Sequence, residues 1–133
     1  MKPRLLTLLL AGALALAGPA AAQAPYPAKP IRLVVPFATG GATDVIGRLV
    51  GAKMSEILGQ QMVVDNRAGA GGNIGVEAAA RSAADGYTLL ATGPNIINTR
   101  YLIKDTPFRW ERDLDALGLM FSSPNVLVVH PSV

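Results

Sequence analysis

The sequence predicts an α/β fold with an open, mainly parallel sheet and helices on both of its faces. Three short apolar runs of strand length alternate with segments whose apolar residues recur at helical spacing. Glycine-rich loops lie where each of the first two runs passes into a helical segment. Because strand–helix–strand units in one sheet are parallel and almost always right-handed, this order predicts a parallel sheet that is covered on both faces.

The first strand and helix are expected between residues 31 and 59. Residues 31–35 are apolar and mostly β-branched, as in a strand buried on both faces. A helix is expected from Ala42, because the apolar residues that follow recur at three- and four-residue spacings: Ile46, Leu49, Val50, Met54, Ile57 and Leu58. Gly59 is expected to end this helix in the left-handed conformation.

The second unit repeats this plan. Residues 62–65 are expected to form a strand and residues 66–72 a glycine-rich loop. The helix that follows is expected to place four small apolar side chains on one face: Val76, Ala79, Ala80 and Ala83. A turn at Asp85-Gly86 then leads to a third strand at 87–91 and a polar loop at 92–95.

The remaining residues are less regular. Residues 98–110 mix polar and aromatic side chains and indicate at most one short helix. Residues 117–121 and 126–129 are apolar and are expected to form two more strands, joined by a turn. Because an apolar, β-branched strand lies so close to Val133, the natural fold is expected to continue beyond this chain.

The N-terminus has the three parts of a secretory signal peptide. Two basic residues precede an apolar run at 5–17, and an A-x-A cleavage site lies at 20–22. A membrane anchor is the alternative, but the run is too short to cross about 30 Å of hydrocarbon. We therefore expect residues 1–22 to be removed and the mature chain, 23–133, to be exported.

Composition excludes several classes of protein. Without cysteine, the chain has no disulfide, thiolate metal site or cysteine nucleophile. The net charge of +3 includes Lys2 and Arg4 of the signal, and the other basic residues are scattered, so no nucleic-acid surface is expected. No Gly-Lys dipeptide is present, and Ile74 stands at the third glycine position of a dinucleotide fingerprint. Because catalytic and metal-ligand motifs are also missing, we expect no cofactor, no metal and no enzyme.

The glycine-rich loops carry the main functional signal. Nine of the 14 glycines fall between Gly40 and Gly75, and they concentrate at the strand-to-helix turns. In a parallel sheet both turns lie at the carboxyl edge, where ligands commonly bind. The first N–H groups of a helix have no intrahelical partner, and the helix dipole adds partial positive charge. Two helix starts at one edge therefore predict a site for a carboxylate or another small anion. The alternative is that the glycines serve only tight turns and close packing.

Individual side chains give weaker indications. Asp44 has three interpretations: a general base without a visible partner, a first-turn carboxylate that favours the helix dipole, or a partner for the ammonium group of an amino-acid ligand. Arg67 is expected to pair either with a ligand carboxylate or with a nearby aspartate. The single histidine, His130, is expected to be a packed or surface residue.

Three ordered motifs carry a family resemblance. They are YPAKPIRLVVPF at 26–37 with GGATD at 40–44, VVDNR at 63–67 with GAGGNIG at 69–75, and DGYTLL at 85–90. Further matches are Tyr101, Pro107-Phe108, Asp113-Leu114 and SPNVLVV at 123–129. Together they resemble the Bug family, the periplasmic solute-binding proteins of tripartite tricarboxylate transporters. The resemblance covers nearly all of the mature chain.

The resemblance implies the first lobe of a two-lobed, type 2-like periplasmic-binding-protein clamshell that closes on a small carboxylate. It implies that main-chain groups of the first two loops hold this carboxylate, partly through ordered waters: Phe37, Ala38, Thr39, Gly40 and Gly41, then Gly69, Ala70, Gly71, Gly72 and Asn73. Thr43 and Asp44 would add side-chain contacts at the first helix start, and Thr92 a contact from the third loop. Thr39 and Ala68 replace prolines that are usual in the family, which is expected to loosen both loops.

The leading hypothesis is a periplasmic, monomeric receptor that delivers a small carboxylate to the membrane subunits of a tripartite tricarboxylate transporter. Because chains of the family are more than twice as long, residues 23–133 are expected to be an incomplete first lobe. Two alternatives stay open. One is a truncated secreted remnant without ligand-binding function, and the other is a small secreted α/β enzyme that acts on an anionic substrate with Asp44 as its base.

Overall fold

The computed structural model describes residues 25–103, 106–124 and 126–132. The predicted signal peptide, residues 1–22, lies outside the described residues. Within the described ranges, no helix has both the length and the apolar character that crossing a membrane requires.

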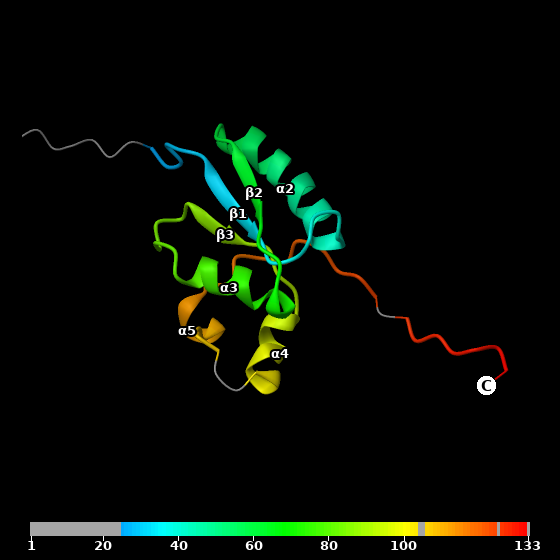
Figure 1. Cartoon of the computed structure of the whole chain (residues 1–133). Helices are drawn as coiled ribbons and strands as arrows, with labels where there is room; N and C mark the ends of the chain where they lie inside the picture. Colours follow the sequence, from blue (N-terminus) through cyan, green and yellow to red (C-terminus); the bar gives the residue numbers. More distant parts are fainter. Residues whose placement is uncertain (1–24, 104–105, 125, 133) are drawn as a thin grey trace, which may run out of the picture.

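The centre of the fold is a three-stranded parallel sheet in the order β2-β1-β3 (Figure 1). The strands are β1, Ile31–Val35, β2, Met62–Asn66, and β3, Thr88–Leu90. The first two strands confirm the predicted positions, and β2 extends one residue further. The third strand is shorter than predicted, although main-chain hydrogen bonds from Arg32 to Tyr87 and from Ala91 to Val34, both 2.9 Å, continue its pairing with β1.

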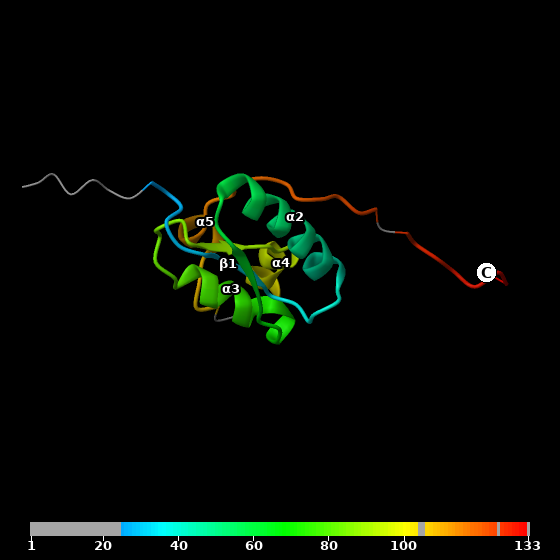
Figure 2. The ribbon, with the colours of Figure 1, turned by 90° about the horizontal axis from the view of Figure 1, so that it is seen from above.

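Two helices cover opposite faces of this sheet, as predicted: α2, Ala42–Leu58, and α3, Asn73–Ala80 (Figure 2). Helix α2 packs on the face that carries Leu33 and Val35, where a Cβ on Gly47 would lie 3.5 Å from Val35 Cγ2. The buried core cluster consists of apolar residues from β1, from β2 and from the position directly after β3: Ile31, Leu33, Val35, Met62 and Ala91. Because successive side chains of β1 point to opposite faces of the sheet, the strand contributes apolar side chains to the packing of both helices.

The predicted end of α2 is confirmed, whereas α3 ends earlier than predicted. Helix α2 ends at Gly59, which has a φ of 66° and donates its N–H to the Ser55 carbonyl at 3.0 Å, so the predicted left-handed glycine is confirmed. Helix α3 ends at Ala80, and the prediction that Ala83 lies on its apolar face is wrong. After Ala80 the α-helical pattern is lost. Ser82 donates its N–H to the carbonyl of Ala79, three residues back, at 3.0 Å, and this tighter turn ends the helix.

The residues after β3 contain two helices, where the sequence predicted at most one. They are α4, Asn95–Leu102, and α5, Trp110–Asp113. Helix α4 begins inside the range that was predicted as a polar loop, because Pro94 directly precedes the helix and has the fixed backbone angle that suits a helix start.

The two additional strands predicted at 117–121 and 126–129 are wrong. In these described residues the backbone forms no strand, and large apolar side chains are exposed, with Leu117 82% and Leu127 94% accessible. The C-terminal part of this segment, drawn in red, leads away from the sheet in Figure 1. A strand needs a neighbour to satisfy its N–H and C=O groups, and no described strand lies beside these residues.

The N-terminal segment is fixed to the edge of the sheet opposite the carboxyl ends of the strands. The Tyr26 hydroxyl donates to the Gly86 carbonyl at 2.7 Å, and the Tyr87 hydroxyl accepts the Ala28 N–H at 2.8 Å. Lys29 lies 4.2 Å from the centre of the Tyr87 ring and 3.3 Å from an Asp85 oxygen. The described chain therefore enters the fold beside the Asp85-Gly86 turn.

Candidate functional site

The three strand ends meet at one edge of the sheet, because all three strands are parallel. Three loops leave this edge: the first loop, residues 36–41, the second loop, residues 67–72, and the third loop, residues 91–94. Each loop leads directly into a helix, α2, α3 or α4. The structure thus brings together the two glycine-rich loops that the sequence singled out.

Three helices begin at this edge. Their N-cap residues are Gly41, Gly72 and Pro94, and in the described structure none of them makes a side-chain hydrogen bond at its cap, since glycine and proline have no side-chain acceptor. At α3 and α4 part of the first turn is bonded within the chain: Asn73 donates its N–H to the Ala70 carbonyl, Ile96 to the Gly93 carbonyl at 3.3 Å, and Ile97 to the Pro94 carbonyl at 3.1 Å. At α2 the described structure gives residues 42–44 no such bond, so their N–H groups are left for water or for a ligand. The sequence predicted the helix starts of α2 and α3; the start of α4 was missed.

The second loop has an unusual backbone that its glycines make possible. Four consecutive residues have positive φ angles: Gly69, Ala70, Gly71 and Gly72, at 128°, 48°, 65° and 99°. Only Ala70 carries a side chain, and it is the one non-glycine residue with a positive φ among those described. Positive φ is rarely adopted by other residues, so the loop shape depends on this glycine pattern.

Asn95 and its neighbours hold the second and third loops together. The Asn95 side chain donates to the Gly71 carbonyl at 3.2 Å and accepts hydrogen bonds from the Gly93 N–H at 3.3 Å and the Thr92 hydroxyl at 3.4 Å. The Asn73 side chain in turn accepts a bond of 2.9 Å from the buried Thr99 hydroxyl. The side chains of Thr92 and Asn73, both predicted at the site, thus serve these internal contacts.

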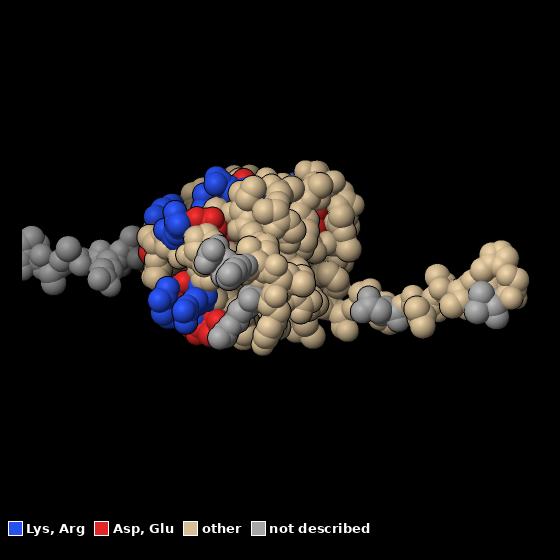
Figure 3. Space-filling model, turned by 60° about the horizontal axis from the view of Figure 1, so that its bottom comes forward, with Lys and Arg blue, Asp and Glu red and all other residues tan. Residues whose placement is uncertain are grey.

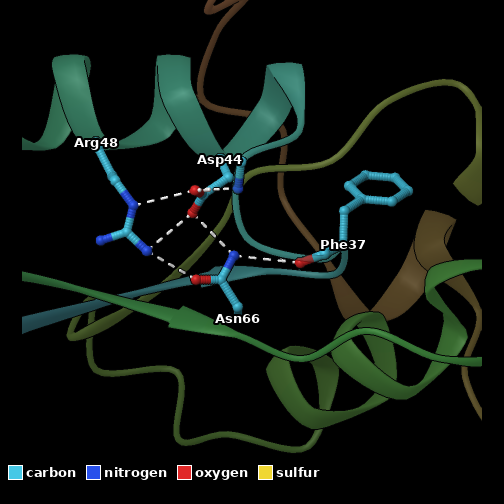
Figure 4. Close-up of polar contacts among 5 residues, drawn as sticks. Phe37, Asp44, Arg48 and Asn66 are labelled. Atoms are coloured by element: carbon cyan, nitrogen blue, oxygen red, sulfur yellow. Dashed lines mark hydrogen bonds and ion pairs between the residues drawn. The ribbon is translucent and has the colours of Figure 1, made fainter.

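Asp44 lies buried at the start of α2, with 2% of its surface accessible (Figure 4). Its Oδ2 accepts the Gly40 N–H at 2.9 Å and Arg48 Nε at 3.1 Å. Its Oδ1 accepts the Asn66 side-chain amide at 2.9 Å and lies 3.0 Å from a terminal nitrogen of Arg48. The Arg48 hydrogen bond above all, then those from Gly40 and Asn66, lower the pKa of Asp44 to about 2.

These contacts decide between the three interpretations of Asp44. A general base works best with a pKa near the pH of the reaction, and a carboxyl with a pKa of about 2 is a poor proton acceptor at neutral pH. A carboxylate offers about four acceptor positions, and protein donors surround both oxygens of Asp44. The structure therefore favours the first-turn carboxylate over a base or a partner for a ligand ammonium group.

Two residues that the sequence did not indicate, Asn66 and Arg48, complete this cluster. Asn66, the last residue of β2, donates from Nδ2 to the Phe37 carbonyl at 3.2 Å as well as to Asp44. Arg48, half exposed on α2, donates to Asn66 Oδ1 at 2.9 Å. Asn66 stands at the end of a strand and before a glycine-rich loop, and this position in the sequence could have predicted that it belongs to the candidate site.

Two other side chains take one of their expected roles. Arg67 Nε lies 2.8 Å from Asp65 Oδ2, so the expected pairing with a nearby aspartate is present. His130 is exposed and lies 2.6 Å from the Ser132 hydroxyl through Nδ1, so it is a surface residue.

Two positive side chains lie at the candidate edge, Arg48 and Arg67, and each is paired with an aspartate. On the face drawn in Figure 3, Lys and Arg lie toward the left of the view, and the opposite end is largely uncharged. The predicted contact residues include no Lys or Arg, so the donors they offer to an anion are main-chain N–H groups, aided by helix dipoles. Within the described residues, no group of three or more His, Cys, Asp or Glu side chains is placed to hold a metal ion.

The sequence matches the family described as "Tripartite tricarboxylate transporter family receptor" (TctC) over residues 46–133. It is 44% identical to the protein BugT of Bordetella pertussis over 111 residues, which are 81% of this chain and 34% of BugT. It is also 44% identical over 104 residues to the "UPF0065 protein in tcbD-tcbE intergenic region" of Pseudomonas sp. strain P51, covering 78% of this chain and 31% of that protein. The chain therefore spans about a third of the length of these curated relatives.

Solved structures share the α/β lobe. A structure described as a periplasmic transporter is 54% identical, with a TM-score of 0.58 over 62% of this chain and 28% of that chain. MatC of Rhodopseudomonas palustris with bound malate is 34% identical, with a TM-score of 0.58 over 66% and 30%. R. palustris Rpa4515 with adipate is 46% identical, with a TM-score of 0.52 over 53% and 24%. By its family match and its Bug relative, the chain belongs to the TctC family of tripartite tricarboxylate transporter receptors, the family of the Bug proteins.

Proposed function

We propose that the mature chain is the first lobe of a periplasmic receptor that binds a small carboxylate at the carboxyl edge of its sheet. The observation that carries this proposal is the meeting of three helix starts and two glycine-rich loops at one edge of a parallel sheet, with no Lys or Arg among the predicted contact residues. Main-chain N–H groups aimed at one region suit a carboxylate, because each donates a hydrogen bond and the helix dipoles add positive potential.

The proposed contacts are main-chain groups of residues 37–41 and 69–73, with the Thr43 side chain at the start of α2. Thr43 is partly exposed there, so its hydroxyl can reach a bound ligand. Asp44 and Thr92 belong to the same edge, and their side chains support the loops. Neighbouring structures hold malate and adipate, which are both dicarboxylates, and this supports a dicarboxylate as the solute of this chain.

The transport role extends this proposal to partners and location. The family is that of a transporter receptor, and one structural neighbour is a TctC solute-binding protein from Polaromonas, 34% identical with a TM-score of 0.56. We infer that this chain is not an enzyme, that residues 1–22 direct it to the periplasm, and that it acts as a monomer which delivers its solute to the membrane subunits of a tripartite transporter.

A second lobe would complete the binding site. The chain spans about a third of the length of its curated relatives, and the apolar residues 117–121 and 126–129 are exposed. Both observations support the proposal that residues 23–133 are one wall of a clamshell.

Calorimetric titration tests the proposal. The chain is expressed as its gene encodes it, read through the nucleotides beyond Val133, and titrated with malate, adipate, citrate, nicotinate and glutamate. Saturable heat with one of these acids is expected. If the reading frame supplies a second lobe and no acid gives heat, carboxylate binding is wrong; if no second lobe follows and the chain binds nothing, the remnant is the correct interpretation.

A further inference from the structure

We propose that Asp44 is a positioning residue that fixes the first loop and couples it to the second, and that it does not itself contact the ligand. This inference rests on the proposed function, since the two loops are the proposed carboxylate site. It assigns the buried carboxylate, Asn66 and Arg48 to one network that shapes the main chain of the site (Figure 4).

The first step is the contact between Asp44 and Gly40. Gly40 directly precedes the N-cap of α2, has a φ of 88°, and donates its N–H to Asp44 Oδ2 at 2.9 Å. A first-turn carboxylate that reaches back to an N–H before its own helix holds the entering chain in one orientation. The direction in which the first loop presents its remaining main-chain groups is therefore set by Asp44.

The second step is the shared amide of Asn66. Its Nδ2 donates both to Asp44 Oδ1 at 2.9 Å and to the Phe37 carbonyl at 3.2 Å, so it holds the beginning of the first loop while Asp44 holds its end. Asn66 is also the residue from which the second loop departs. A displacement of the Asp44 carboxylate therefore reaches both loops.

The third step concerns charge. An ionised carboxylate next to an anion site repels the ligand unless a cation neutralises it. Arg48 contacts both oxygens of Asp44, at 3.1 and 3.0 Å, and donates to Asn66 at 2.9 Å. The network thereby combines charge-assisted hydrogen bonds with a net charge of zero, which suits a site for a negatively charged solute.

The experiment compares Asp44→Asn with Asp85→Asn. Asp85 is a matched control, since it also accepts a main-chain N–H, from Tyr87 at 3.0 Å, and also pairs with a cation, Lys29, but lies at the opposite edge of the sheet. The chain is expressed as its gene encodes it and titrated with malate and adipate. Asp44→Asn is expected to weaken binding about tenfold or more, as the loss of a charge-assisted hydrogen bond implies. Asp85→Asn is expected to leave affinity unchanged, whatever its effect on thermal stability.

Two further readouts keep the outcome decisive. Asp44→Asn is expected to shift the amide NMR signals of Gly40 and of residues 69–72, and Asp85→Asn to shift neither group. Arg48→Gln removes only a half-exposed side chain, so it serves if Asp44→Asn does not fold. It is expected to weaken malate binding, because it leaves the Asp44 carboxylate without the cation that neutralises it.

Each result bears on a different claim. If the unsubstituted chain binds none of malate, adipate, citrate, nicotinate and glutamate, the proposed function is wrong, and the amide shifts alone then judge the coupling of the two loops. If that chain binds and Asp44→Asn binds equally well, the positioning role is wrong. The same conclusion follows if the signals of residues 69–72 stay in place in Asp44→Asn, or if Arg48→Gln binds malate as tightly as the unsubstituted chain.

Discussion

The side-chain amide of Asn95 donates a hydrogen bond of 3.2 Å to the carbonyl of Gly71, so the first residue of α4 holds the second loop in place. The same side chain accepts bonds from Thr92 and Gly93 in the third loop. One asparagine therefore joins the third loop, which directly precedes it, to Gly71 of the second loop, 24 positions away in sequence. This contact makes α4 part of the candidate edge.

Asn95→Ala is expected to lower the free energy of unfolding by about 1 kcal/mol, since it removes hydrogen bonds that are only partly buried. The matched control is Asn98→Ala, which removes an exposed asparagine from the same helix. Urea unfolding followed by circular dichroism measures both variants. Equal losses in the two variants would show that Asn95 does not support the loop.

Gly75→Ala is expected to lower the free energy of unfolding by about 2 kcal/mol or more, because overpacking a tight contact displaces backbone. A Cβ at this position would lie 2.7 Å from Pro36 Cα and 2.8 Å from the Arg67 carbonyl oxygen, and neither backbone atom can move freely. Gly118→Ala is the control, since its Cβ would have no neighbour within 4 Å. A Gly75→Ala variant as stable as Gly118→Ala in urea would contradict the close packing of α3 on the first loop.

Asp44 is expected to make the stability of the chain depend on pH in the acid range. The pKa of Asp44 is about 2 in the folded chain against 3.8 as its ordinary value, so its contribution is present above pH 3.8 and is lost as the pH falls through about 2. The difference in unfolding free energy between the unsubstituted chain and Asp44→Asn is therefore expected to be largest above pH 4 and to shrink toward pH 2. Denaturation curves at successive pH values measure it, and a difference that does not change with pH would contradict the ionised, hydrogen-bonded carboxylate.

Leu127→Ser and Leu117→Ser are expected to leave the free energy of unfolding unchanged, because both leucine side chains are more than four-fifths exposed. They are expected to reduce self-association of the 133-residue chain, since contiguous exposed apolar residues favour contacts between molecules. Sedimentation velocity over a range of concentrations measures this effect. Loss of stability in either variant would show that these segments pack on the lobe.

Much of the lobe is predictable because its signals are local. The strand at Ile31–Val35 and the helix at Ala42–Leu58 each carry their own periodicity, and the glycine at position 59 ends the helix through its own backbone freedom. The strands expected at 117–121 and 126–129 failed because a strand depends on a partner, which a local pattern does not contain.

The candidate site also has one part that the sequence predicted and another part that it did not. That two glycine-rich loops meet at one edge follows from the parallel order of the strands, and the sequence predicted it. The role of Asp44 depends on Asn66, which is 22 positions away, and the start of α4 depends on Pro94 and has little apolar periodicity. Contacts between distant residues decide which side chains face inward, and no spacing rule contains them.

The reliance on peptide N–H groups at the helix starts has a consequence for how such a receptor can change. A point mutation replaces a side chain and leaves the peptide group in place, so few single substitutions can delete a donor from this edge. The donors can be redirected, through the glycines at positions 69, 71 and 72 whose backbone angles other residues avoid. If this edge binds an acidic group as proposed, its affinity depends on the path of the main chain, and the surrounding side chains are free to diverge toward different solutes.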